Sequence, residues 1–295
     1  MLSFSPEQIA RLESCAECPR VCRANRFEAK GYCKSPPVPR LASANLHTGE
    51  EPPISGTRGS GTIFFTGCNM SCRFCQNYPI SQLGHGREIS LDSLVSAMLG
   101  LQSRGAHNIN FVTPSHASIA LEAAIPAARE SGLTIPIVYN SSGYDSLEQL
   151  RRLDGLIEIY MPDIRYARGE IAKELSNAPD YPEINRAALR EMHRQVGDLA
   201  LDDDGIATRG LIVRHLVLPG GRADTELALK FLVEEISPNT HVSLMAQYFP
   251  AYEAREIPGM NRKITAPEWQ LALDAFITSG LNGWAQEFAE DNELC

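Results

Sequence analysis

Three cysteines, Cys68, Cys72 and Cys75, lie within eight residues in the segment TIFFTGCNMSCRFCQNYP. They follow a short apolar run that is typical of a buried strand. Three thiolates this close together can surround one metal centre but cannot saturate it. A tetrahedral structural zinc site takes four protein ligands, and common iron–sulfur frameworks use four cysteines. The CxxxCxxC spacing therefore indicates a cluster with one iron left open to another ligand.

A structural zinc site is the alternative for these three cysteines. Zinc accepts sets of three cysteines and one histidine, and His47 or His85 is the candidate for the fourth ligand. The strand before the loop and the α/β pattern after it favour the cluster.

The loop resembles that of the radical S-adenosylmethionine (SAM) enzymes, where three cysteines hold a [4Fe-4S] cluster and the methionine end of SAM chelates the fourth iron. More narrowly, GTRGSGTIFFTGCNMSCRFCQN resembles the signature of glycyl-radical-enzyme activating enzymes of the pyruvate formate-lyase type, and in particular uncharacterised homologues with a cysteine-rich N-terminus. Phe74 replaces the usual Trp or Tyr, and Tyr78-Pro79 replaces Pro-Glu. The resemblance extends from about Cys15 to Tyr252.

This resemblance implies an oxidoreductase that cleaves SAM to a 5′-deoxyadenosyl radical, which abstracts hydrogen from a substrate. The implied cofactors are a [4Fe-4S] cluster on Cys68, Cys72 and Cys75, and SAM; the implied electron donor is a flavodoxin or ferredoxin. An activating enzyme would act on a glycine of a partner glycyl-radical enzyme or other protein. A small molecule or peptide is the alternative substrate. A non-enzymatic zinc-binding interaction protein is the alternative from another class.

The composition sets limits on the partners. The chain has 295 residues, of which 43% are apolar and 21% charged, and its formal net charge is −9. Its length fits one α/β barrel with a large core. We expect no nucleic-acid partner, because such a partner requires a basic surface. No apolar run approaches the roughly eighteen residues that span a bilayer, so no membrane association is expected.

Eight cysteines occur in this chain, and its start, MLSFSPEQIARLES, does not have the pattern of a secretory signal. This combination indicates a reducing compartment, the cytoplasm, and metal ligation rather than disulfides. A second group of four, Cys15, Cys18, Cys22 and Cys33, predicts another metal site. Its occupant is either zinc or a second iron–sulfur cluster. Cys295 is expected to be a free thiol.

Residues 1–60 and residues 61–295 differ in composition and in periodicity. Residues 1–60 are rich in cysteine, proline and glycine and show little periodicity, so we expect a metal-binding N-terminal extension. In residues 61–295, apolar runs alternate with helical patterns, which predicts βαβ units and a parallel sheet.

The predicted strands are Thr62–Phe65, Asn108–Val112, Ile135–Tyr139, Ile157–Met161, Gly210–Val217 and His241–Met245. The predicted helices are Ser90–Arg104, Ser118–Glu130, Ser146–Leu153, Ile184–Val196, Thr225–Ile236 and Pro267–Ser279. A further short strand or a turn is expected at Gly280–Trp284. The fold class is therefore α/β, a partial (β/α)6 barrel of the TIM type, with a flat doubly wound sheet as the alternative.

Functional groups of parallel barrels cluster where the strands end. Asp163 and Arg165 alternate after the fourth strand, so both side chains point to one face. Arg214 lies inside an apolar strand, where a charge is costly unless it is paired. By resemblance, Arg214 meets the SAM carboxylate, while ion pairs between these residues are the structural alternative. The full set of candidate SAM contacts is Phe74, Asn77, Thr113, Ser115, Ser141, Asp163, Arg165, Arg214 and Tyr248.

Overall fold

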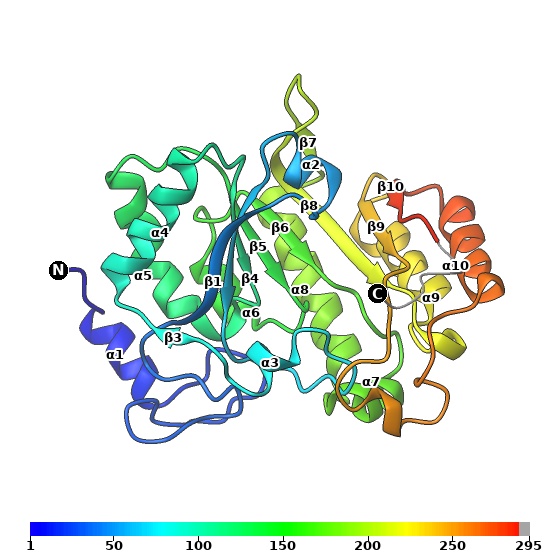
Figure 1. Cartoon of the computed structure of the whole chain (residues 1–295), viewed down its shortest axis with the longest axis horizontal. Helices are drawn as coiled ribbons and strands as arrows, with labels where there is room; N and C mark the ends of the chain where they lie inside the picture. The colour runs from blue at the N-terminus through cyan, green and yellow to red at the C-terminus, as the bar shows by residue number, and fades with distance from the viewer. Residues whose placement is uncertain (289–295) are drawn as a thin grey trace.

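A ten-stranded sheet forms the centre of the computed structural model, which describes residues 1–288 (Figure 1). The strands are β1 (Arg40–His47), β2 (Ser60–Phe65), β3 (Arg87–Glu88), β4 (Ile109–Val112), β5 (Ile137–Ser141), β6 (Ile159–Pro162), β7 (Ala200–Leu201), β8 (Ala207–Leu216), β9 (His241–Met245) and β10 (Asn282–Ala285). Their order is β10-β9-β8-β6-β5-β4-β2-β1-β3, and β7 pairs with β8.

The six predicted strands are β2, β4, β5, β6, β8 and β9, and each is parallel to the next along the chain. A doubly wound sheet reverses its strand order at a switch point. Here the order from β2 to β10 follows the sequence without reversal. The α/β prediction and the partial TIM-type barrel are therefore confirmed, and β10 adds a seventh parallel strand where the sequence left a strand or a turn open.

The longer helices cover the outer face of this curved sheet (Figure 1). The α-helices are α1 (Pro6–Glu13), α2 (Pro52–Ser55), α3 (Tyr78–Ser81), α4 (Leu91–Ser103), α5 (Ser118–Glu130), α6 (Leu147–Arg152), α7 (Gly169–Ser176), α8 (Tyr181–Val196), α9 (Thr225–Phe231) and α10 (Ala266–Ser279). The predicted helix Thr225–Ile236 is divided, because α9 ends at Phe231 and a π-helical turn continues to Ile236. Helix α8 begins three residues earlier than predicted, with Pro182 in its first turn, where a proline is tolerated.

Five of the six predicted strands differ from the observed ones by one to three residues at one or both ends, and strand β1 was not predicted. Strand β5 begins at Ile137 rather than Ile135, because Pro136 has no amide proton and contributes only its carbonyl, which accepts from the Ile109 amide. Strand β1 was missed altogether. It lies within the region expected to be irregular, yet it pairs antiparallel with β2 and belongs to the main sheet. The boundary at residue 60 remains a prediction, with β1 on its N-terminal side.

The connection between β1 and β2 plugs the amino end of the barrel. Ile54 of α2 is fully buried there, and its carbonyl accepts a 2.8 Å hydrogen bond from the Asn108 side chain. It packs inside the barrel against a small apolar cluster composed of Val138, Ile159, Met161, Ala207 and Ile212. The plug therefore closes one end of the barrel and leaves the other end, where the strands finish, for the site.

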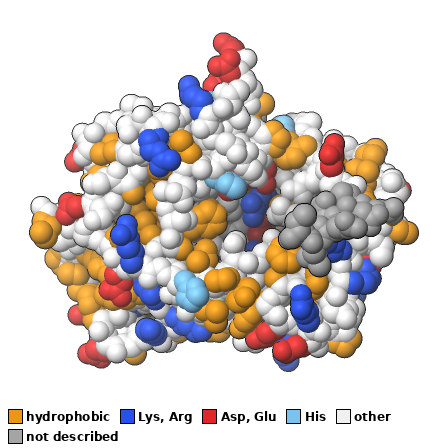
Figure 2. All heavy atoms as spheres, viewed as in Figure 1, with side chains coloured by type: hydrophobic (Ala, Val, Ile, Leu, Met, Phe, Trp, Pro, Cys, Tyr) orange, Lys and Arg blue, Asp and Glu red, His pale blue; other side chains and the backbone are white. Residues whose placement is uncertain are grey.

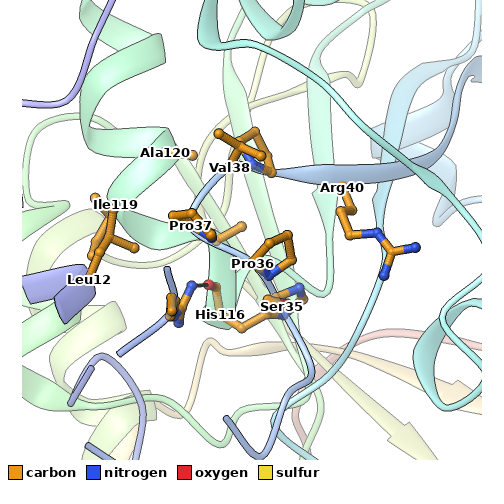
Figure 3. A pocket seen from close by; sticks show the side chains of 12 residues that line it. Leu12, Ser35, Pro36, Pro37, Val38, Arg40, His116, Ile119 and Ala120 are labelled. Carbon is orange, nitrogen blue, oxygen red and sulfur yellow. Dashed lines mark hydrogen bonds between the residues drawn. The ribbon is translucent and has the colours of Figure 1, made fainter. Parts of the chain in front are cut away.

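The N-terminal segment packs against the opposite, carboxyl end of β2 and the start of α5. Figure 3 shows Leu12 of α1 beside Ile119 of α5, with Pro37 and Val38 close to Ala120. The cavity between them has a volume of about 10 Å³. It has room for no more than about one water molecule, so it is a packing gap rather than a ligand site.

No helix within residues 1–288 is both long enough and apolar enough to cross a bilayer. The expectation of a free thiol at Cys295 falls outside the described residues.

Candidate functional site

The loop that carries Cys68, Cys72 and Cys75 leaves the carboxyl end of β2 and leads into α3. Cys72 is buried, and the other two are partly buried. Gly67, directly before the first cysteine, has φ +92°, and a Cβ built there would lie 2.5 Å from the carbonyl oxygen of Cys33. The loop is therefore held in contact with the N-terminal cysteine segment at a position that favours glycine.

Each of the three sulfurs has a polar neighbour. The Met70 amide donates to Cys68 Sγ over 3.3 Å, and Cys75 Sγ lies 3.1 Å from the Ser81 hydroxyl. Cys72 Sγ accepts two hydrogen bonds of 3.1 Å, from Arg165 Nη1 and from the Ser176 hydroxyl. Such contacts favour the thiolate form, which is the form that binds iron.

Without a metal, the deprotonated forms of these cysteines are unfavourable in their buried positions. Burial raises the pKa of Cys68 and of Cys75, and the nearby charge of Cys72 raises both further. A bound cation reverses this balance, because metal binding requires deprotonated thiols and releases their protons. The donor set therefore fits an iron–sulfur cluster. Within residues 1–288, no group of three or more His, Cys, Asp or Glu side chains is arranged to hold a single metal ion.

A cavity of about 380 Å³ opens beside this loop. Figure 2 shows a hollow on the face toward the viewer, with charged side chains of both signs inside it. The cavity is lined by His47, Gly49, Glu50, Phe64, Phe74, Cys75, Gln76, Asn77, Val112, Asn140, Asp163, Arg165, Arg214, Leu216, Leu218, Met245 and Gln247. Most of these residues come from the cluster loop and from the parallel strands or the segments that follow them, as the barrel rule predicts, while His47, Gly49 and Glu50 come from β1 and the connection after it.

Asp163 joins two arginines at the cavity wall. Its Oδ2 accepts from Arg165 Nη2 over 2.6 Å, and its Oδ1 accepts from Arg214 Nε over 3.0 Å. Burial alone would raise the pKa of Asp163, but the charges of Arg214 and Arg165 outweigh it and hold the pKa below its usual range. The ion pairs named as the structural alternative are thus present, and the same arginines also face the cavity.

The other candidate SAM contacts divide into two groups. Phe74 and Asn77 line the cavity with Asp163, Arg165 and Arg214. The remaining four are not among its lining residues and are Thr113, Ser115, Ser141 and Tyr248. The roles of all nine remain predictions.

Ser141 faces away from the cavity because strand side chains alternate. Its hydroxyl donates to Asp145 Oδ2 over 2.6 Å, while its neighbour Asn140 lines the cavity. The Tyr248 hydroxyl donates to the Met260 carbonyl, and its ring lies 5.9 Å from that of Phe74. These contacts fix the orientation of the Ser141 and Tyr248 side chains.

Three residues of this cavity were not among the candidate SAM contacts, although His47 was considered as a zinc ligand. His47 ends β1, Glu50 lies in the connection from β1 to β2, and Asn140 belongs to β5. The first two come from the segment EEPPISG and its surroundings, whose prolines and glycines indicated an irregular extension. Asn140 could have been found from the two-residue alternation of β5, once the start of that strand was placed correctly.

Three of the four N-terminal cysteines, Cys15, Cys18 and Cys33, lie close to the buried guanidinium of Arg26. Cys15, Cys18 and Cys33 are buried and Cys22 is exposed. The Arg26 Nε donates to Cys15 Sγ over 3.2 Å. Burial raises the pKa of Cys18 to about 12, opposed by a backbone hydrogen bond from Arg20 and reinforced by the charges of Cys33 and Cys15. The occupant of this group remains a prediction.

This N-terminal segment is bonded to the cluster loop. The Tyr32 hydroxyl donates to the Ser71 hydroxyl over 2.8 Å, and Arg20 Nε donates to the Asn69 carbonyl over 2.9 Å. The Arg20 guanidinium also lies 4.0 Å from the centre of the Tyr32 ring, a cation–π contact. The loop therefore depends on the extension for its support.

Gly67→Ala is expected to destabilise the protein by about 2 kcal/mol and to lower iron incorporation, because the new Cβ would be strained and would displace Cys33. Gly132→Ala is the matched control, since Gly132 has φ +99° and nothing lies within 4 Å of its built Cβ. Urea unfolding and iron analysis measure both. An equal loss in the two variants, with equal iron, would contradict a supporting role for the Cys33 contact.

His215 lies on the outer side of β8, next to α9, and it is fully buried. Its Nδ1 lies 2.7 Å from the Ile164 carbonyl, and its Nε2 lies 3.0 Å from the Thr225 hydroxyl. Burial lowers the pKa of His215 to about 4, against the opposing hydrogen bond to Ile164 and the charges of Asp163 and Asp224.

Because the folded pKa of His215 lies below the unfolded value of about 6.5, its contribution to stability is present above pH 6.5 and is lost as the pH falls toward 4. Between pH 7 and pH 5 this loss is about 2 kcal/mol. His215→Asn is expected to remove that part of the pH dependence in urea unfolding, with exposed His85→Asn as the control. A wild-type pH slope in H215N would contradict the assignment.

Known proteins resemble this chain in sequence and in fold. The sequence model of the radical SAM superfamily matches residues 62–197, which include all three loop cysteines. The uncharacterized protein MJ0674 of Methanocaldococcus jannaschii is 30% identical over 273 residues, which make up 89% of this chain and 74% of that protein. The chain belongs to the radical SAM superfamily.

Solved structures support the fold at lower identity. Streptococcus suis SuiB bound to S-adenosylmethionine gives a TM-score of 0.51 at 12% identity, covering 75% of this chain and 48% of SuiB. SuiB bound to its precursor peptide SuiA gives a TM-score of 0.50 at 12% identity, covering 75% of this chain and 46% of SuiB. The chain spans about half the length of these proteins, and the similarity concerns the fold alone.

Proposed function

We propose that this chain is an enzyme that cleaves SAM reductively and abstracts a hydrogen atom from a substrate held in the cavity. The observation that carries the proposal is the position of Cys68, Cys72 and Cys75 directly beside a cavity lined by Asp163, Arg165 and Arg214. A [4Fe-4S] cluster bound by these cysteines would supply the electron for SAM cleavage and thereby the radical chemistry.

Residues of this chain would tune the cluster and would bind and orient the ligand in the cavity. Arg165 donates to Cys72 Sγ over 3.1 Å while its other nitrogens are fixed by Asp163. Hydrogen bonds to the sulfurs are one of the terms that set the potential of an iron–sulfur centre. Arg214 Nε is occupied by Asp163, so its outer nitrogens are the donors left for a carboxylate in the cavity.

The substrate that the cavity favours is a small molecule or the side chain of a peptide. Its walls carry charges of both signs, which suits a polar ligand. Activation of a glycyl-radical partner is the second candidate, supported by the resemblance of residues 56–77 to activating enzymes. A glycyl-radical doublet in electron paramagnetic resonance, formed with such a partner, is its test.

For the N-terminal group of Cys15, Cys18, Cys22 and Cys33, we propose zinc or a second iron–sulfur cluster. Its bonds to the cluster loop support a structural role with either occupant. A second cluster would also supply a route for electrons from a flavodoxin or ferredoxin. Iron and zinc analysis of a Cys72→Ser variant, which retains only the N-terminal set intact, distinguishes the two occupants.

Anaerobic reconstitution with iron and sulfide tests the main proposal. The reduced protein is expected to convert SAM to methionine and 5′-deoxyadenosine without added substrate. Stoichiometric zinc with no SAM cleavage would contradict the enzyme and support the non-enzymatic zinc-binding alternative.

A further inference from the structure

Two buried carboxylates at the amino end of the barrel have no place in the function proposed above. Glu50 and Glu51 immediately precede α2, the plug of the barrel, and Glu50 lines the cavity. Their side chains are only 8% and 6% exposed. Burying a charged carboxylate without a close partner is unfavourable, so two such carboxylates are expected to have a binding partner.

The cations of the cavity do not satisfy this pair. Arg214 Nη1 lies 3.9 Å from an oxygen of each glutamate, beyond hydrogen-bond distance, while its Nε is bonded to Asp163. Arg165 is also bonded to Asp163. Three carboxylates therefore share two guanidiniums, and Glu50 and Glu51 have only the 3.9 Å contacts to Arg214 as their share. In agreement, burial raises the pKa of Glu50 to about 7, opposed by the charge of Arg214 and reinforced by that of Glu51.

Asn110 provides an independent sign of a missing ligand. It is fully buried on β4, two residues before Val112 and thus on the same, cavity-lining side of the strand. It lies close enough to Glu50 to influence the pKa of that carboxyl. Yet neither its amide oxygen nor its amide nitrogen has a hydrogen-bond partner, and Oε2 of Glu51 has none either. Buried polar atoms normally have a partner in the protein or in a bound molecule.

We propose that Glu50, Glu51 and Asn110 form a subsite for an organic cation, an amine or guanidine group of the substrate. This inference rests on the proposed function, because it names the substrate class for the same cavity. A group rich in N–H donors matches the unpaired oxygens of Asn110 and Glu51, and its charge complements the two glutamate carboxylates.

A metal ion is a poorer occupant than an organic cation. Within the described chain no set of three or more His, Cys, Asp or Glu side chains is arranged to hold one. Because Glu50 enters from the plug and Cys75 from the cluster loop, the subsite anchors the charged end of the substrate and leaves its carbon chain toward the loop.

The test uses the anaerobically reconstituted full-length protein and two matched probes, 1,4-diaminobutane and the neutral 1,4-butanediol, in isothermal titration calorimetry. The diamine is expected to bind at least about 10-fold more tightly than the diol, as one charge-assisted hydrogen bond provides. Glu50→Gln and Glu51→Gln are each expected to weaken the diamine about 10-fold. Glu130→Gln, at an exposed position on α5, is the control and should bind like the wild type.

Four results overturn the inference: no diamine binding up to about 10 mM, equal binding of diamine and diol, wild-type diamine binding in both glutamine variants, or binding of Mg²⁺ in place of the diamine. If a glutamine variant folds poorly in circular dichroism, Asn110→Leu replaces it, and unchanged diamine binding in N110L has the same consequence. Formation of 5′-deoxyadenosine without substrate, in the same preparation, separates this inference from the proposed function. Cleavage without diamine binding refutes the subsite alone, whereas diamine binding without cleavage refutes the proposed function alone.

Discussion

Cys72→Ser is expected to lower SAM cleavage by at least about 100-fold. Loss of a residue that only supports a metal ligand costs up to about 100-fold, and Cys72 is expected to be a ligand itself. Cys72 is the most buried of the three loop cysteines and accepts hydrogen bonds from both Arg165 and Ser176. A serine hydroxyl is a hard and weakly acidic ligand that replaces a thiolate poorly on iron. Iron content, the visible spectrum of the cluster and 5′-deoxyadenosine formation measure the effect.

The matched control for this change is Cys22→Ser, which removes an exposed thiol of the N-terminal group. It is expected to leave the signals of the loop cluster in place. Cys68→Ser and Cys75→Ser should behave like Cys72→Ser. Substantial SAM cleavage by any of the three loop variants would show that the cysteine in question is not a ligand.

Asp163→Asn is expected to destabilise the protein by about 3 kcal/mol, the lower end of the range for breaking a buried ion pair. Its side chain is 8% exposed and joins Arg165 and Arg214, whose side chains are 24% and 20% exposed. The neutral amide would leave two largely buried guanidiniums without their closest carboxylate. Urea unfolding of the metal-free protein measures the loss, so the result does not depend on activity.

The same substitution should also weaken SAM binding, because Asp163 fixes the direction of both guanidiniums that face the cavity. Exposed Asp203→Asn is the control and should change stability by less than about 0.5 kcal/mol. If D163N were as stable as D203N, the ion pairs of Asp163 with Arg165 and Arg214 would not stabilise the fold, and their geometry would not support ligand binding.

The parallel core of the fold could be predicted from sequence because its strands are short apolar runs separated by helical patterns. His241–Met245 and Ser118–Glu130 have the predicted bounds. Strand β1 could not be predicted in the same way, because only one of its eight residues is buried and its segment is surrounded by prolines and glycines. Its position depends on antiparallel pairing with β2, which local sequence does not encode.

The site was predictable where residue types are chemically unusual. Three closely spaced cysteines, and charges at Asp163, Arg165 and Arg214 in or after apolar strands, directed attention to side chains that the structure gathers around one cavity. Glu50 and Asn110 gave no such signal. A glutamate before two prolines is typical of a solvated loop, and its burial follows only from the way α2 enters the barrel.

The proposed chemistry requires that the three loop cysteines leave one iron of a [4Fe-4S] cluster free for SAM. Electron–nuclear double resonance on the reduced protein, with SAM labelled by a magnetic oxygen isotope in its carboxylate, tests this directly. We expect a hyperfine coupling between that oxygen and the cluster. A cluster that shows no such coupling while a fourth side chain of the protein ligates the remaining iron would contradict the proposed chemistry.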